Sequence, residues 1–140
     1  MKDKRLEGSL GYALVRAFRR VNRASNRALA AFGLSAEQAH ILLILWDEGP
    51  LKVGELQERL ALGSGTITGA LDRMDKLRLV RRVADPSDGR AFRVEAMPFE
   101  TKKQNAVVRS LEKMENEAFG AMSEKERKEL LRLLSKIEAV

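Results

Sequence analysis

The segment 53–94 constrains the fold most strongly, because it places two short amphipathic helices directly before a β-hairpin. In KVGELQERL, residues 52–60, apolar side chains recur at helical spacing. A glycine-containing turn follows, and Gly63 or Ser64 is suited to cap a second helix that we expect to end near Leu77. Two short helices joined by a turn of this kind form a helix-turn-helix unit.

The hairpin is predicted by turn residues between two apolar runs. DPSDG contains a proline that fixes φ, a glycine that permits positive φ, and aspartates that can accept hydrogen bonds from nearby amides. Val80 and Val83 precede this turn, and Phe92 and Val94 follow it. The hairpin is also basic: arginines occupy its two arms and its tip, at Arg81, Arg82, Arg90 and Arg93.

The rest of the chain is predicted to be helical, so the fold class is mainly α with a small β-hairpin wing. The pairs Ser35 with Gln38 and Ser123 with Glu126 are capping-box signatures. Further helices are expected from Leu10 to about Phe32, from Ser35 to Gly49, after Pro98, and from Ser123 onward. With 140 residues the chain is expected to form one domain, 1–140, with a winged helix-turn-helix lobe at 34–95 and helical segments at 1–32 and 98–140.

Composition narrows the class of function. The chain has a net charge of +6 and no cysteine, so disulfides and thiolate metal sites are excluded. Residues 1–32 hold eight basic and two acidic side chains, and residues 64–94 hold seven and four. A basic balance favours polyanionic partners. We find no secretory signal and no apolar run of membrane-spanning length, so a cytoplasmic location is expected and no membrane partner.

The second helix of the helix-turn-helix unit has the properties of a helix that enters a DNA major groove. Its first half carries small hydroxyl residues and glycines, and basic residues follow. Glycine inside a helix costs about 1 kcal/mol relative to alanine, which calls for an explanation such as close backbone approach to another molecule or packing against a neighbouring helix. The candidate DNA contacts are Ser64, Gly65, Thr66, Thr68, Gly69, Arg73 and Lys76.

The hairpin arginines are further candidate DNA contacts, in addition to those of the helix. Arg81, Arg82 and Arg93 on the arms are expected to meet phosphates, and Arg90 at the tip can reach an adjacent minor groove, where negative potential is concentrated. Asp88 would repel DNA if left unpaired. We therefore expect Asp88 to face inward and to hold an arginine in position.

These residues resemble the MarR (multiple-antibiotic-resistance regulator) family of winged helix-turn-helix transcription factors. The resemblance runs from Leu34 to Phe92 and, in helix order, over nearly the whole chain. It rests on LSAEQAHILLIL, on GPLKVGELQERLALGSGTITGALDRMDKLRLVRR, and on DPSDGR as the wing tip. The resemblance implies that Thr66, Thr68 and Arg73 contact DNA from the recognition helix and that Asp88 and Arg90 form the wing pair.

Four features depart from the family pattern. Arg78 stands where the family usually has a glycine closing the recognition helix, which would force a non-glycine residue toward positive φ. Gly69 stands where a longer polar side chain often reads a base, and Gly89 replaces the first arginine of the wing tip. AMPFE replaces the Leu-Thr start of the next helix.

The resemblance also implies a homodimer and a small effector. A symmetric dimer would bury the apolar stripes of the terminal helices and place two recognition helices on a pseudo-palindromic operator of double-stranded DNA. The expected function is a repressor modulated by a small aromatic or anionic effector, with no cofactor. Tyr12, His40 and Trp46 are candidate effector-lining residues, although His40 and Trp46 also fit a core position.

Two other classes of function were weighed. One is a dimeric helical protein-interaction module with a degenerate winged helix, to which Gly69, Arg78 and Gly89 lend support. Whatever the function, the arginines of the first helix taken alone are interpreted as a solvated face, with a binding surface as the alternative. The other is an enzyme, which we do not expect, because the chain has one histidine, no phosphate-binding glycine loop and no recognisable carboxylate pair.

Overall fold

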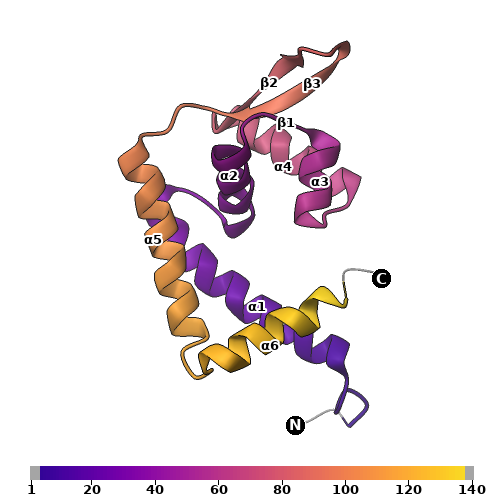
Figure 1. Ribbon diagram of the computed structural model, residues 1–140, viewed down its shortest axis with the longest axis vertical. Coiled ribbons are helices and arrows are strands. Elements are labelled where there is room, and N and C mark those ends of the chain that lie inside the picture. The colour runs from indigo at the N-terminus through magenta and orange to yellow at the C-terminus, as the bar shows by residue number, and fades with distance from the viewer. Residues whose placement is uncertain (1–3, 138–140) are drawn as a thin grey trace. The chain divides into compact units, whose positions relative to one another are not determined.

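The computed structural model describes residues 4–137, which divide into two compact units. Residues 29–107 form one unit, called here the winged-helix unit. The chain up to residue 28 and from residue 108 onward forms the other, called here the helical unit. Figure 1 shows the course of the chain through both.

The order of elements is the one that the sequence predicts, with one addition. The elements are α1 (Leu10–Leu29), a 3-10 turn (Ala30–Phe32), α2 (Ala36–Glu48), β1 (Leu51–Lys52), α3 (Val53–Leu60), α4 (Ser64–Lys76), β2 (Val80–Asp85), β3 (Asp88–Ala96), α5 (Thr101–Ala118) and α6 (Glu124–Ser135). The predicted capping boxes at Ser35 and Ser123 are both present, and Gly63 is the N-cap of α4.

The addition is the short strand β1, which makes the sheet three-stranded in the order β1-β3-β2. The predicted two-stranded hairpin is therefore incomplete. Leu51 pairs with Val94 and Lys52 with Arg93, both in antiparallel register. Two residues are too few for a strand to show a period of two in the sequence, so only the partner strand β3 defines β1.

The core of the winged-helix unit forms around the apolar faces of α2 and α4. Ile67, Ala70, Leu71 and Met74 recur at steps of three, one and three residues and are all buried. Their spacing places them on one side of α4 and leaves the other side of the helix to solvent. Further buried side chains come from the rest of the unit, among them Leu29, Ile41, Leu42, Leu45, Leu56, Val80, Val94 and Val107.

Two helices of this unit end on non-glycine residues with left-handed backbone. Ala61 after α3 has φ 52°, and Arg78 after α4 has φ 57°. At Arg78 the closing hydrogen bonds are complete, because the Arg78 amide donates to the Asp75 carbonyl and the Leu79 amide to the Met74 carbonyl, both at 2.9 Å. The predicted positive φ at Arg78 is thus confirmed, and the exit of α4 has the ordinary glycine-type geometry without the glycine.

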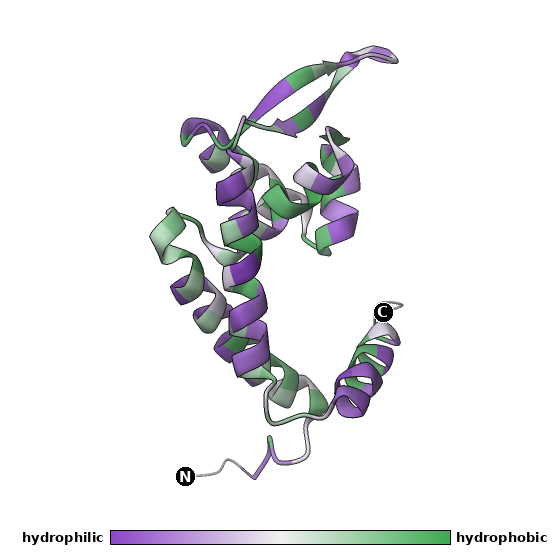
Figure 2. Cartoon of the chain, turned by 60° about the vertical axis from the view of Figure 1, so that its left-hand side comes forward, coloured by the Kyte–Doolittle hydropathy of each residue, from purple (hydrophilic) through white to green (hydrophobic). Residues whose placement is uncertain are grey.

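The helical unit has no core of its own comparable to this one. Every buried apolar residue of the described chain lies between positions 29 and 107. In the helical unit the Ser25 hydroxyl donates to the Val21 carbonyl and contacts the Met114 sulfur at 3.8 Å, which joins α1 to α5. Large apolar side chains stay exposed on α1 and α6, including Leu10, Phe18, Leu131 and Leu133. Hydrophobic and hydrophilic stretches alternate along these helices (Figure 2).

Within residues 4–137, no single helix is long and apolar enough to cross a membrane. The bent pair Leu10–Phe32 and Ala36–Glu48 passes that test only when its two helices are taken together, on length and composition alone.

The strain at Arg78 gives a first prediction. Left-handed backbone costs a non-glycine residue about 1 to 2 kcal/mol, and glycine loses part of that gain to its freer unfolded chain. Arg78→Gly should therefore raise the free energy of unfolding by about 1 kcal/mol, measured by urea denaturation. Lys76→Gly, two residues earlier inside α4, is the control and should lower the free energy of unfolding by about 1 kcal/mol. A destabilised Arg78→Gly variant would contradict the strain assigned to this position.

Candidate nucleic-acid interface

The solvent side of α4 gathers all the residues predicted to contact DNA on the recognition helix. Ser64, Gly65, Thr66 and Thr68 are exposed in the first half of the helix, and Arg73 and Lys76 are exposed in the second half. The Thr68 hydroxyl donates to the Ser64 carbonyl at 2.9 Å, which fixes its side chain against the helix. The first half of the exposed side of α4 therefore carries only short side chains, three of them with hydroxyl groups. Its C-terminal half is cationic.

The glycines of α4 have no packing role. A Cβ on Gly65 would meet no atom within 4 Å. A Cβ on Gly69 would meet only the Nη1 atom of Arg73, at 3.4 Å. The alternative that these glycines serve packing against a neighbouring helix is therefore wrong. Gly69 instead leaves room for the Arg73 side chain, one turn further on, to lie back along α4.

The wing arms carry arginines that have carboxylate partners within the unit. Arg81 pairs with Glu95 across the hairpin. Arg82 pairs with Asp72 at 2.6 Å and Asp75 at 3.2 Å, both on α4. Its guanidinium also lies over the Phe92 ring, 5.5 Å from the centroid. These arginines therefore tie β2 to β3 and to α4, and their contact with phosphates remains a prediction.

The carboxylate that faces inward is Asp85, so the expected inward position of Asp88 was wrong, although Asp88 does hold an arginine, through the backbone amide of Arg90. The Asp85 side chain is fully buried and lies 3.6 Å from the Lys52 Nζ atom and 3.5 Å from the Arg93 Nε atom. The amide and hydroxyl of Ser87 both donate to Asp85, at 2.9 and 2.8 Å. Asp88 is exposed, and its carboxylate accepts the backbone amide of Arg90 at 3.0 Å.

This environment stabilises the charged form of Asp85. The two hydrogen bonds from Ser87, with the positive charges of Arg93 and Lys52, lower its pKa from 3.8 to about 2, against the opposing effect of burial. Lys52 comes from β1, Arg93 from β3 and Ser87 from the turn. Asp85, the last residue of β2, therefore joins β1, β3 and the turn of the wing.

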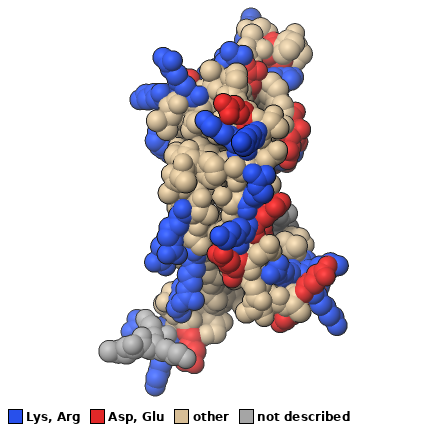
Figure 3. Space-filling view, turned by 90° about the vertical axis from the view of Figure 1, so that its left-hand side faces the viewer, with Lys and Arg blue, Asp and Glu red and all other residues tan. Residues whose placement is uncertain are grey.

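Four cations of the interface have no ion-pair partner among residues 4–137. They are Arg73 and Lys76 on α4, Arg78 at its exit, and Arg90 at the wing tip. All four are exposed. On the face drawn in Figure 3, basic side chains gather in more than one place, with acidic side chains between them.

Comparison with known proteins identifies the family. The MarR family pattern matches residues 34–92. Over 135 residues the chain is 34% identical to the HTH-type transcriptional regulator MgrA of Staphylococcus aureus, which covers 94% of this chain and 89% of that protein. The chain belongs to the MarR family. MarR proteins are winged helix-turn-helix, DNA-binding transcriptional regulators, so the sequence-based prediction of the family is confirmed.

Solved MarR-type structures have the same fold. Bordetella bronchiseptica BpsR, whose DNA binding is regulated by 6-hydroxynicotinic acid, superposes with a TM-score of 0.87 at 23% identity, over 99% of both chains. A mutant of MarR from E. coli, complexed with operator DNA, superposes with a TM-score of 0.80 at 22% identity, over 97% of this chain and 99% of that chain. These likenesses extend the family fold to both units.

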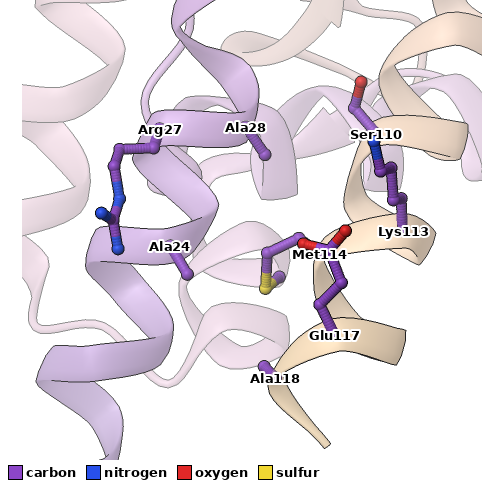
Figure 4. Close-up of a pocket in the computed structure, with 8 residues that line it drawn as sticks. All are labelled: Ala24, Arg27, Ala28, Ser110, Lys113, Met114, Glu117 and Ala118. Carbon is purple, nitrogen blue, oxygen red and sulfur yellow. The ribbon is translucent and has the colours of Figure 1, made fainter. Parts of the chain in front are cut away.

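A cavity of about 570 Å³ lies within the helical unit of this MarR chain, between α1 and α5 (Figure 4). Small apolar side chains and the Met114 thioether point toward it. Charged side chains stand at its edge. Its lining is Ala24, Arg27, Ala28, Ser110, Lys113, Met114, Glu117 and Ala118.

None of the three predicted effector residues lines this cavity. Tyr12 is exposed on α1, with the Arg16 guanidinium 5.8 Å from its ring centroid. His40 is exposed, so its interpretation as a core histidine was wrong. Trp46 is half-buried, stacks at 5.3 Å on Phe99, and has no hydrogen-bond partner for its Nε1 atom among the described residues.

Sequence reasoning missed the residues that position the wing. Asp85 precedes a proline and stands two residues before Ser87, which is the spacing at which an aspartate accepts an amide in a turn. That signal could have indicated Asp85 in place of Asp88. No comparable signal marks Lys52, because it meets Asp85 only through the pairing of β1 with β3.

The low pKa of Asp85 gives a second prediction. Because the folded state keeps Asp85 ionised down to about pH 2, its contribution to stability is complete above its ordinary pKa of 3.8 and is lost as the pH falls toward 2. Asp85→Asn should therefore destabilise the protein at pH 5 and above, and the difference from the unmodified protein should shrink between pH 4 and 2. Denaturant titrations at each pH measure this difference. Asp88→Asn, which removes an exposed carboxylate of the same turn, is the control, and an equal effect of both variants would contradict the assignment.

Proposed function

We propose that the protein is a homodimeric repressor that reads a pseudo-palindromic operator with α4 in the major groove and Arg90 in the minor groove. The observation that carries the proposal is the division of cations in the winged-helix unit. The arginines of the wing arms have carboxylate partners, whereas Arg73, Lys76, Arg78 and Arg90 have none among the described residues. These four remain available to phosphates and bases.

The shape of α4 supports insertion into a groove. A major groove admits one helix, and a helix with short side chains can bring its backbone closest to the base edges. Ser64 and Thr66 can donate and accept hydrogen bonds there, whereas Thr68, which donates to the Ser64 carbonyl, can accept them. Arg73 can form a bidentate contact with a guanine or a phosphate. Arg90 is exposed at the wing tip, two residues after Asp88, and its side chain is suited to a narrow minor groove.

A second copy of the chain accounts for the exposed apolar surface of the helical unit. Leu10 is 87% exposed, Phe18 64% and Leu131 68%. A soluble protein rarely leaves such side chains in contact with water, and a symmetric dimer buries them while it duplicates the recognition helix. Two α4 helices about 34 Å apart would then match successive major grooves on one side of a duplex.

The cavity between α1 and α5 is the proposed site for an effector. It combines an apolar floor with the charged groups of Lys113 and Glu117 on α5, a combination suited to a small aromatic molecule that carries a polar or anionic group. BpsR, with the same fold, is regulated by such a compound. An effector would release DNA only to the extent that it prefers a dimer whose recognition helices are wrongly spaced.

The degenerate protein-interaction module receives no support from the geometry. Arg78 keeps the helix exit of the family, and Gly69 accommodates a basic side chain on the α4 surface.

Selection of bound fragments from random DNA tests the proposed operator binding directly. Recovery of an inverted repeat is expected, and the absence of any enriched sequence would contradict the proposal.

Gly65 supplies a third prediction. A Cβ at this position has open space, so Gly65→Ala should raise the free energy of unfolding by up to about 1 kcal/mol. The same methyl group should weaken operator binding, because it separates the α4 backbone from the groove. Gly54→Ala is a matched control, since Gly54 is also the second residue of its helix and also faces open space. Equal operator affinity of the two variants, measured by fluorescence anisotropy, would contradict backbone approach at α4.

Arg90 supplies a fourth prediction. Arg90→Glu places a negative charge in the proposed minor-groove contact and should weaken binding to the selected repeat at least about 10-fold. Lys103→Glu makes the same charge change at an exposed position of α5 and should have a much smaller effect. The wing assignment is wrong if both variants bind the repeat equally.

A further inference from the structure

The arginines of α1 form a second unpaired cationic surface, on the helical unit. Four of them follow one another at steps of four, three and four residues, which places them on one face of the helix, with a fifth beside them. All are exposed, and none has an ion-pair partner among residues 4–137. The α1 arginine face consists of Arg16, Arg19, Arg20, Arg23 and Arg27.

The pattern differs from an ordinary solvated helix face. On α6 of the same unit, Lys128 pairs with Glu124 and Arg132 pairs with Glu129, so charges alternate and compensate. By contrast, the whole of α1, Leu10–Leu29, contains no acidic residue. Like charges three and four residues apart repel and destabilise a helix, so an external anion would relieve this arrangement.

The dimensions of the face suit an extended polyanion. From Arg16 to Arg27 the helix rises about 16 Å, with a cation at each turn. A groove of about 400 Å³ along this face is lined by Arg20, Arg23, Asn26 and Arg27, with no acidic and no apolar side chain among them. Every cation in the row is an arginine, whose planar fork binds phosphate through two hydrogen bonds.

A lipid surface is the less favoured occupant. A membrane-bound amphipathic helix inserts its apolar face into the lipid. In α1 that face is directed to protein, because Ser25 contacts Met114 and because Ala24 and Ala28 face the cavity shared with α5. In the homodimer proposed above, on which this choice rests, the remaining apolar residues are covered as well. Only the arginine side of α1 then faces outward.

We propose that the α1 arginine face is a second DNA-binding surface, which contacts the phosphate backbone of duplex DNA without sequence preference. When a regulator binds its operator, the phosphate backbone of the flanking DNA lies close to the rest of the protein. Duplex DNA is therefore the polyanion that this face is most exposed to. Each dimer would carry two such faces in addition to its two recognition helices. This surface would add affinity for DNA of any sequence and would make total binding more sensitive to salt.

The test compares two four-fold variants of the full chain that remove the same number of charges. The first, the α1 variant, changes Arg16, Arg20, Arg23 and Arg27 to Gln. The second, the α6 control, changes Lys125, Lys128, Arg132 and Lys136 to Gln. Glutamine keeps nearly the helix propensity of lysine and arginine. Circular dichroism and sedimentation establish that each variant is folded and has the oligomeric state of the unmodified protein.

Binding to a 30-base-pair duplex of mixed sequence is measured as a function of salt. For each α1 face that contacts the duplex, loss of four phosphate contacts should make the slope of log K against log salt shallower by about 3 to 4, and should weaken binding at low salt at least about 10-fold. The α6 control should retain the slope of the unmodified protein. If the α1 variant does not fold, Arg23→Gln against Lys128→Gln gives the same comparison with an expected change in slope of about 1.

Three results would overturn the proposal. The slopes of the α1 variant and the α6 control could be equal. The α1 variant could become monomeric with an unchanged slope, which would make the row a contact between protomers. Phosphatidylglycerol vesicles could bind the unmodified protein and not the α1 variant while the DNA slope stays unchanged, which would make the row a membrane contact. Arg90→Glu on the selected repeat tests the operator assignment separately, so the two proposals can fail independently.

Discussion

Ion pairs between carboxylates and basic side chains, within the wing and between the wing and α4, set the charge that the winged-helix unit presents. Buried Asp85 binds Lys52 and Arg93, and Asp72 and Asp75 hold Arg82. These contacts fasten the hairpin to β1 and to the recognition helix. They also remove arm arginines from the set of unpaired cations. A surface that looks uniformly basic in the sequence is therefore basic mainly along α4 and at the wing tip.

The recognition helix α4 is part of the same set of contacts. Its apolar side is fixed by burial of residues such as Ile67 and Met74, and its polar side supplies both the hydroxyl groups and the aspartates that hold the wing. At the two glycines no side chain covers the backbone on the exposed side of α4, and Gly69 lets the Arg73 side chain lie along the helix. Specificity would then come from hydroxyl groups, one arginine and the shape of the duplex rather than from several long side chains.

The two units distribute burial and charge in opposite ways. The winged-helix unit holds the buried apolar residues of the described chain and neutralises much of its charge internally. The helical unit exposes both apolar side chains and unpaired arginines. Its apolar side is suited to a second copy of the chain, and its cationic side to a polyanion. A dimer that uses both sides would contact DNA through the α1 arginine faces as well as through its recognition helices and wings.

The sequence by itself determined the order of helices, both serine capping boxes, the hairpin and the positive φ at Arg78, because each follows from residues close together in the chain. The same local reasoning placed the residues predicted to contact DNA on one side of α4. Only the tertiary structure decided the pairing of β1, the burial of Asp85 in place of Asp88, the exposure of His40 and the carboxylate partners of Arg81 and Arg82. Those outcomes depend on which segments meet across the sheet and between sheet and helix. These pairings join residues as far as 43 positions apart in the chain, as for Leu51 and Val94, and no local pattern encodes them.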